Sequence, residues 1–379
     1  MTREHVVDGT QFFALFYDQP LASLGLEPGP LASRDDGQPL PTPARLFGTS
    51  TEDEWRPLEA LPAELLRLRF TRRSPCSTFS RDQALYWPSE HRYQLALAVP
   101  LGANRAFLAF EHGLALTVTA TGAKPVSNLP RLSFAGGGYD PRTDELWLIQ
   151  RNGEVLRGHP DRGFRAAPPL TAAGEVVDLA ISPEAWPFSI GVVTTSVAAY
   201  AFDGATWAER LPPRTSGAAD SPIRIASTGP GEYTVIGAAR TTALEATING
   251  HQVVPLEGLD EGLSPDEPLA VFFLPGWGPL IGTEGGILRR GPSSYLPLLG
   301  EGTPLTKVLV PRGGGFLFGG QQGSLSEVLA DRTICPIVNY ALGLNDDFVA
   351  LIPVGDNYLA FPETGTSTYY PIVVLRPSL

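Results

Sequence analysis

The sequence predicts an all-β fold made of seven similar units of short strands. Three observations support this prediction. The chain contains 41 glycines and 37 prolines, about a fifth of its 379 residues, which is a high density of turn residues. Its apolar residues gather in short runs and not in long helical patterns. From Pro100 to Pro353 these runs recur in six intervals that average about 42 residues, a spacing typical of repeat architectures.

Each unit begins with an apolar run that ends at or near a proline. The seven prolines are Pro100, Pro141, Pro183, Pro230, Pro275, Pro311 and Pro353. We expect these first runs to form the innermost strands, because neighbouring units would enclose them on both faces.

A second and a third apolar run follow in each unit, separated by short turns. The second runs are 106–110, 145–149, 188–193, 233–238, 279–283, 316–320 and 358–361. The third runs are 113–120, 153–158, 196–202, 241–248, 285–291, 323–330 and 366–372, and weaker fourth runs lie at 204–211, 251–258 and 294–301. Glycines between the first and second runs predict tight hairpins with positive φ; they are Gly136–Gly138, Gly231, Gly276, Gly278, Gly313–Gly315 and Gly355.

Residues 92–379 resemble a seven-bladed β-propeller, because three or four strands repeated at this spacing are typical of its four-stranded blades. One unit, GGGYDPRTDELWLI at 136–149, is similar to a kelch-type blade, with glycines followed by Tyr139 and then Trp147. The other six units lack this tyrosine–tryptophan pairing. The resemblance is therefore to the architecture, and it implies a closed ring of antiparallel sheets.

Residues 1–91 differ from the repeat and predict an N-terminal extension. Within it, 20–44 is rich in proline, glycine and serine and predicts a linker, 10–17 predicts a strand, and 51–70 predicts short helical turns. The strand at 10–17 or a strand at 66–70 could complete the ring by pairing with the last unit. Alternatively, residues 43–90 form an eighth blade with strands at 44–48, 65–70 and 83–88.

The charge balance excludes two classes of partner. The net charge is −12, which disfavours both nucleic acid and anionic lipid surfaces. No apolar stretch reaches the length of a membrane span. The N-terminus lacks the pattern of an intact signal peptide. We therefore expect a cytoplasmic protein if this N-terminus is native, and a secreted or periplasmic one if a signal peptide has been removed.

The chain contains two cysteines, Cys76 and Cys335, which lie 259 positions apart. If they form a disulfide, it closes a very large loop. The alternative is two free, partly buried thiols, because two cysteines alone do not make a disulfide framework.

Motifs that would carry catalysis are missing from the sequence. The five histidines have no metal-ligand spacing, and the glycine-rich stretches lack the lysine and the hydroxyl residue of a phosphate-binding loop. We therefore predict no catalytic residue, no metal and no cofactor. Three carboxylates, Asp140, Asp144 and Glu145, crowd one hairpin. Calcium binding is one interpretation, but the sequence favours a turn in which Asp140 caps its own loop.

Two tryptophans, Trp186 and Trp277, lie between the first and second runs of their units and are flanked by prolines. Equivalent loops share one face of a repeat ring, so we predict that this face binds a ligand and that these two side chains anchor it. The alternative is that they pack over blade edges. In that case the opposite face or the acidic outer rim becomes the binding surface.

Three classes of function remain compatible with these features. We favour a monomeric, non-catalytic recognition or scaffold propeller that binds a protein partner. The alternatives are a carbohydrate-binding propeller of a secreted or cell-surface system, and a hydrolase or lyase with its site at the channel mouth.

Overall fold

The computed structural model describes part of the chain. The described residues are 2–7, 10–15, 78–81, 85–88, 95–130, 132–182, 188–214, 222–257, 267–299, 306–320, 324–330, 332–337, 348–362 and 369–378. The chain divides into two units, Met1–Cys76 and Ser77–Leu379. The predicted linker at 20–44 and the helical turns expected at 51–70 lie outside the described residues.

The first unit contains one described hairpin. Strand β1 (Thr2–Val7) pairs antiparallel with β2 (Thr10–Leu15), from Thr2 opposite Leu15 to Val7 opposite Thr10. The strand expected at 10–17 is therefore present. Its partner is β1 and not the last unit of the repeat.

In the second unit, strands follow the predicted repeat closely. The first strands are β5 (Leu95–Leu101), β9 (Phe134–Asp140), β13 (Val176–Ile181), β17 (Arg224–Gly229), β21 (Pro268–Leu274), β25 (Thr306–Arg312) and β29 (Phe348–Val354). The second strands are β6 (Arg105–Phe110), β10 (Glu145–Gln150), β14 (Ile190–Thr194), β18 (Glu232–Ala239), β22 (Gly278–Thr283), β26 (Gly315–Gly320) and β30 (Asn357–Pro362). The third strands are β7 (Ala115–Thr119), β11 (Val155–His159), β15 (Ala199–Phe202), β19 (Thr242–Thr247), β23 (Ile287–Arg290), β27 (Leu325–Val328) and β31 (Tyr369–Ser378).

The fourth strand completes each blade on the outside. The fourth strands are β8 (Gly122–Pro125), β12 (Gly163–Ala167), β16 (Trp207–Leu211), β20 (Gly250–Pro255), β24 (Tyr295–Leu299) and β28 (Ile334–Ile337), and β3 (Thr78–Arg81) serves the seventh blade. Within the described ranges, the helical structure amounts to one short 3-10 turn, Glu111–Gly113. No helix in those ranges combines the length and hydrophobicity that crossing a membrane requires.

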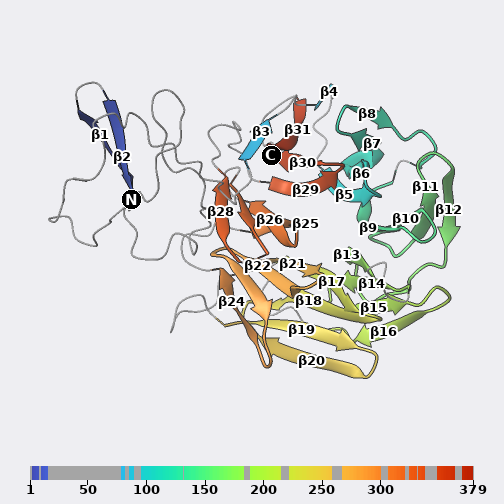
Figure 1. Ribbon diagram of the computed structural model, residues 1–379. Coiled ribbons are helices and arrows are strands. Elements are labelled where there is room, and N and C mark those ends of the chain that lie inside the picture. The colour runs from blue at the N-terminus through green and yellow to red at the C-terminus, as the bar shows by residue number, and fades with distance from the viewer. Residues whose placement is uncertain are drawn as a thin grey trace. The chain divides into compact units, whose positions relative to one another are not determined.

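The described strands of the second unit form seven antiparallel sheets in a closed ring (Figure 1). Each innermost strand contacts the innermost strands of both neighbouring sheets, and β29 contacts β5 where the ring closes. The prediction of a seven-bladed β-propeller is confirmed, and the eight-bladed alternative is wrong.

Residues just before the repeat close the ring. Strand β3 pairs with β31, with Phe79 opposite Pro377, and β4 (Leu85–Pro88) pairs with the start of the same strand. The side chain of Phe79 is buried in a cluster shared by the sixth and seventh blades, and the Arg312 guanidinium lies 5.0 Å from its ring centre. The run at 83–88, expected as part of an eighth blade, therefore extends the seventh. The runs at 44–48 and 66–70 lie outside the described residues.

The prolines mark equivalent strand ends, as the sequence predicts. Pro100, Pro311 and Pro353 are each the penultimate residue of an innermost strand, while Pro141, Pro230 and Pro275 directly follow one. Pro183 lies outside the described residues.

The glycine cluster Gly136–Gly138 has a different role from the one predicted. These residues lie inside β9 and not in a hairpin. A Cβ on Gly136 would lie 2.7 Å from the Leu179 nitrogen, and one on Gly138 would lie 2.7 Å from Ile181 Cγ1. Gly136 and Gly138 are glycine because the innermost strand of the third blade approaches too closely for a side chain, while a Cβ on Gly137 would lie 2.7 Å from Leu97 Cδ2 of the first blade. The hairpin assignment holds for Gly231, Gly276, Gly278, Gly313, Gly314 and Gly355, which all have positive φ.

The hydrophobic core is divided among the seven contacts between adjacent blades. Each buried cluster draws residues from two neighbouring sheets, as in the cluster that joins Val193 and Ala199 of the third blade to Tyr233 and Val235 of the fourth. Because each sheet buries both faces only against its neighbours, the blades depend on one another for stability.

Candidate functional site

The strand order distributes the loops over two faces of the propeller. The turns between first and second strands, and between third and fourth strands, lie at one end of each sheet. We call this end the tryptophan-loop face, because it carries Trp277 in the turn after β21. The turns between second and third strands, and the connections to the next blade, lie at the other end, which we call the pocket face.

Trp277 packs against the neighbouring blade. Its side chain is only 8% exposed, its Nε1 donates a hydrogen bond to the Gly314 carbonyl oxygen at 3.0 Å, and its ring meets that of Phe316 edge-on with centroids 5.2 Å apart. These contacts are those of the packing role that the sequence left open, and binding through Trp277 stays a prediction. Trp186, the second predicted anchor, lies outside the described residues.

The carboxylate of Asp140 is occupied within its own turn. It accepts hydrogen bonds from the backbone nitrogen of Arg142 at 3.1 Å, from Arg142 Nε at 2.8 Å and from Thr143 Oγ1 at 3.1 Å. Asp140 therefore caps its loop, as the sequence favours. Among the residues that the structure describes, no three metal-binding side chains gather where they could hold an ion.

A charged network on the tryptophan-loop face joins the first and second blades. Arg105 of β6 donates to Asp161 Oδ2 at 2.8 Å, and the Asp161 backbone nitrogen donates to His159 Nδ1 at 3.2 Å. The imidazole of His159 is buried, so this contact fixes the ring beneath the surface. The network therefore connects β6 of the first blade to the turn between β11 and β12 of the second blade.

Asp144 forms the other half of this network. It accepts hydrogen bonds from Tyr139 Oη and from Arg162 Nη2, both at 2.8 Å. The hydrogen bond from Tyr139 lowers the pKa of Asp144, while burial and that same carboxylate raise the pKa of Tyr139 to about 12. Each of these charged groups has a partner inside the network. The hydrogen bonds of Asp144 hold two turns of the second blade together, and Arg105 links them to the first blade.

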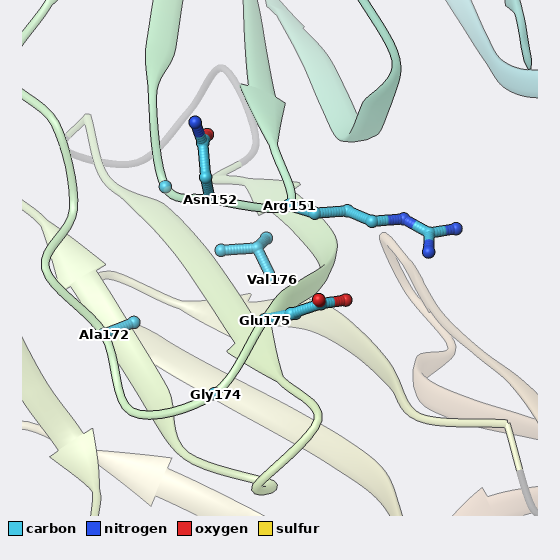
Figure 2. A pocket seen from close by; sticks show the side chains of 7 residues that line it. Arg151, Asn152, Ala172, Gly174, Glu175 and Val176 are labelled. Atoms are coloured by element: carbon cyan, nitrogen blue, oxygen red, sulfur yellow. The ribbon is translucent and has the colours of Figure 1, made fainter.

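A pocket of about 290 Å³ lies on the pocket face (Figure 2). It lies between the turn that joins β10 to β11 and the connection from β12 to β13. The lining residues are Arg151, Asn152, Gly153, Ala172, Gly174, Glu175 and Val176.

Backbone hydrogen bonds fix the two segments that form the pocket. The nitrogen of Val176 donates to the Arg151 carbonyl oxygen, and that of Leu170 donates to the Gly153 carbonyl oxygen, both at 2.9 Å. Gly153 has a φ of +88°, and a Cβ on it would lie 2.1 Å from the Leu170 oxygen. The close crossing of the two segments therefore requires glycine at this position.

Hydrogen bonds with the turn between β14 and β15 of the third blade hold the pocket wall in place. Glu175 and Thr195 exchange two hydrogen bonds: the Glu175 nitrogen donates to Thr195 Oγ1 at 3.1 Å, and the Thr195 nitrogen donates to the Glu175 oxygen at 2.7 Å. The same turn holds Val197 at a φ of +53°, a conformation that is unfavourable for a β-branched residue. Strain of this kind persists only where surrounding contacts hold it, so the pocket wall is a rigid one.

Two opposite charges stand at this pocket without partners of their own. Arg151 and Glu175 are both exposed, and their side chains extend to the same side of the pocket (Figure 2). Neither forms an ion pair with any residue in the described part of the chain. Val176 lies between them, and Ala172 lines the far side of the pocket (Figure 2). A ligand could therefore meet both a guanidinium and a carboxylate here.

Asp178, two residues beyond the pocket wall, joins the third blade to the fourth. Its carboxylate accepts hydrogen bonds from the backbone nitrogens of Ile225 at 3.1 Å and Leu179 at 2.8 Å. Burial raises the pKa of Asp178. The hydrogen bonds of this buried carboxylate therefore help to hold β13 and the adjoining pocket wall in position.

We expect Asp178→Asn to gain stability relative to the wild type as the pH rises from about 4 to 7. A carboxyl group with a raised pKa in the fold stabilises it when protonated and loses this contribution as the pH rises through that pKa. Urea denaturation at several pH values measures the difference. Asp203→Asn is the control with the opposite sign, because backbone nitrogens of Thr206 and Ala205 lower the pKa of Asp203. Equal pH slopes for the two variants would contradict the prediction.

Comparisons with known proteins extend only to the fold. No protein-family model and no curated protein matches the chain. A structure described as YCF48 bound to D1 peptide is 13% identical, with a TM-score of 0.55, over 78% of this chain and 96% of the other. An inactive virginiamycin B lyase from Staphylococcus aureus, solved with quinupristin, is 10% identical, with a TM-score of 0.60, over 79% and 99%.

The WD40 propeller domain of Doa1 is also similar, at 7% identity and a TM-score of 0.55, over 78% of this chain and 97% of the other. Sequence identities this low show that the folds are similar, but they do not show that the sites or the functions are. The chain is a seven-bladed β-propeller.

Proposed function

We propose that this protein is a non-catalytic recognition propeller that binds a segment of a protein partner through its pocket face. The observation that carries the proposal is the pairing of two exposed, unpartnered charges, Arg151 and Glu175, with a pocket whose backbone is fixed on three sides. A rigid frame with free charges at its mouth favours a ligand that supplies the opposite charges.

The size and chemistry of the pocket favour a peptide segment. At about 290 Å³ it lies at the lower end of the range of ligand pockets, so it suits one or two side chains better than a large molecule. Neighbouring residues of a polypeptide readily supply both an acidic and a basic group. A neutral sugar would leave both charges unpaired, and Trp277, one of the two tryptophans predicted to anchor a ligand, is only 8% exposed.

A likeness in fold is consistent with this proposal. The similar structure described as YCF48 bound to D1 peptide holds a peptide on the same kind of ring. This is an analogy of architecture, and the proposal rests on the charges and frame of the pocket in this chain.

The proposal predicts that Arg151→Ala combined with Glu175→Ala weakens partner binding about tenfold or more, because each lost ion pair removes both attraction and orientation. Affinity capture from the source cell with the wild type identifies the partner, and titration of the purified pair measures the change. The wild-type affinity should also fall as salt is added, since the charges are solvent-accessible.

Arg165→Ala is the matched control, because Arg165 is an exposed arginine of the same blade that pairs with Glu145 and does not line the pocket. It should bind like the wild type, and all three proteins should melt at similar temperatures. If the double variant retains the same partner with the affinity of the control, or if the wild type retains no specific protein, the proposal is refuted.

A further inference from the structure

Basic side chains gather where the outer strand of the third blade meets that of the fourth. Strand β16 of the third blade contacts both β19 and β20 of the fourth (Figure 1). The guanidinium of Arg214, three residues beyond the end of β16, donates a hydrogen bond to His251 Nε2 in β20. Two side chains that can both carry positive charge are therefore in direct contact at this junction.

The corresponding junctions on either side use different partners. Between the second and third blades, Trp207 Nε1 donates to the Pro168 carbonyl oxygen at 3.0 Å. Between the fourth and fifth blades, Ser294 Oγ donates to the Glu257 carboxylate. Each of these contacts pairs a donor with a neutral or an anionic acceptor, so neither of them brings two basic groups together.

A second arginine, Arg210, lies over the same row of the fourth blade as His251. Tyr233 of β18, Ala246 of β19 and His251 of β20 stand opposite one another, so their side chains share one face of the sheet. That face meets the third blade, because a Cβ on Gly191 of β14 would lie 2.2 Å from the Tyr233 ring. Burial raises the pKa of Tyr233 to about 12, and the nearby Arg210 guanidinium opposes this rise. Arg210 therefore acts on one end of the row, and the guanidinium that contacts His251 lies at the other.

A bulge in β16 directs Arg210 toward this face. The pairing register of β16 with β15 shifts between Glu209 and Leu211, which leaves Arg210 as an extra residue. Bulges of this kind redirect a side chain out of the regular alternation. The Nε of Arg210 is buried and has no hydrogen-bond partner, although a buried N–H group is costly without an acceptor. This donor therefore calls for an acceptor from outside the chain.

No carboxylate in the part of the chain that the structure describes neutralises Arg210, Arg214 or His251, which we call the outer basic cluster. The neighbouring Glu209 stands opposite Tyr200, which packs between the second and third blades, so its side chain belongs to the other face of the sheet. His251 is exposed and both arginines are partly exposed. The cluster thus offers positive charge and N–H donors to an anion that arrives from solvent.

We propose that the outer basic cluster binds a doubly charged oxyanion, a phosphate or sulfate group, between the outer strands of the third and fourth blades. Two guanidinium groups match the charge of such a group, and each can donate two parallel hydrogen bonds to its oxygens. A carboxylate has one charge and two oxygens, which are too few for two guanidinium groups and an imidazole. None of the three side chains lines the pocket of Arg151 and Glu175, so this is a second site.

The test uses the full chain with inorganic phosphate and inorganic sulfate as probes, each compared with chloride at equal ionic strength. We expect either dianion at about 20 mM to raise the melting temperature by roughly 2–4 °C above the value in chloride. The C–H signals of the histidine rings in NMR spectra locate the site. The signal of His251, assigned with His251→Gln, should shift until it saturates, while those of the other four histidines stay in place. Acetate should cause neither effect.

Substitutions of the two arginines separate binding from stability. Arg214→Gln should weaken sulfate binding at least tenfold, yet in chloride it should melt like the wild type, because the charge that it removes has no carboxylate partner in the described part of the chain. Arg210→Lys keeps the charge but loses the Nε–H and the planar fork, so it should also weaken binding at least tenfold. Arg240→Gln is the matched control: Arg240 is an exposed arginine of the fourth blade that pairs with Glu267, and its variant should keep the wild-type affinity.

A phosphoserine peptide shows whether the anion is a free ion or part of a protein. Val253 lies two residues from His251 on the same face and is 52% exposed, so the labelled peptide carries an aliphatic residue beside its phosphoserine. If this peptide binds at least tenfold more tightly than inorganic phosphate, the site receives a phosphorylated side chain. If the two affinities are equal, the site receives the free ion. Either result supports the proposal, and the unphosphorylated peptide should not bind.

Four results would overturn the proposal. The first is no change in melting temperature or in the His251 signal with either dianion. The second is an equal response to acetate, and the third is a shift of another histidine without one at His251. The fourth is equal sulfate affinity of the wild type and Arg214→Gln. Melting curves show whether each variant is folded, and the titration of the wild type tests the site without any substitution.

Discussion

Cys335→Ala should lower the free energy of unfolding by roughly 4–5 kcal/mol, the contribution of a disulfide that closes a very long loop. Cys335 lies in β28 with 1% exposure and is disulfide-bonded. The chain has one other cysteine, Cys76, which is 259 positions away and lies outside the described residues. The pairing of these two residues remains a prediction, and the expected effect is large because a crosslink of this span removes much of the freedom of the unfolded chain.

A double-mutant comparison decides the pairing. If Cys76 is the partner, Cys76→Ala should cost as much as Cys335→Ala, and the double variant should cost no more than either. Chemical denaturation with and without reductant measures these differences, and reduced wild type should behave like the variants. Thiol titration of denatured, unreduced protein should detect no free thiol. Two free thiols in protein from its natural compartment would refute the bridge and favour a cytoplasmic location.

Trp277→Ala should lower the free energy of unfolding by about 3–5 kcal/mol, the usual cost of removing a buried aromatic side chain. The indole fills the contact between the fifth and sixth blades, where it packs with Leu274, Leu280 and Phe316. It also satisfies the Gly314 carbonyl oxygen, which would lose its donor. The cavity and the lost hydrogen bond act on the same contact between blades.

Trp277→Phe separates these two contributions. Phenylalanine keeps an aromatic ring beside Phe316 and loses the hydrogen bond, so its cost should be smaller, about 1–2 kcal/mol. Thermal and chemical denaturation measure both variants. An alanine variant that keeps its stability and loses partner binding would restore Trp277 as the binding anchor that the sequence predicts.

Local sequence patterns determined the blades. Apolar runs, turn glycines and the recurrent prolines place strands within a few residues of their observed bounds, because alternation and turn preference act over short distances. The capping of its own turn by Asp140 is also a local feature that the sequence predicts, because the groups that donate hydrogen bonds to Asp140 are only two and three residues away. The number of blades followed from counting these local units.

Contacts between blades decided the features that the sequence alone did not predict. Gly136–Gly138 resemble turn glycines in sequence, yet they admit the strand of the next blade; Trp277 has the setting of an exposed loop residue, yet it packs against Phe316. The ring closes through β3 and β31, which are almost three hundred residues apart, and the pocket joins Arg151 to Glu175. Repeat spacing reports how each blade is built but not which side chains meet across the gap between blades, because that depends on the close packing of neighbouring sheets in three dimensions.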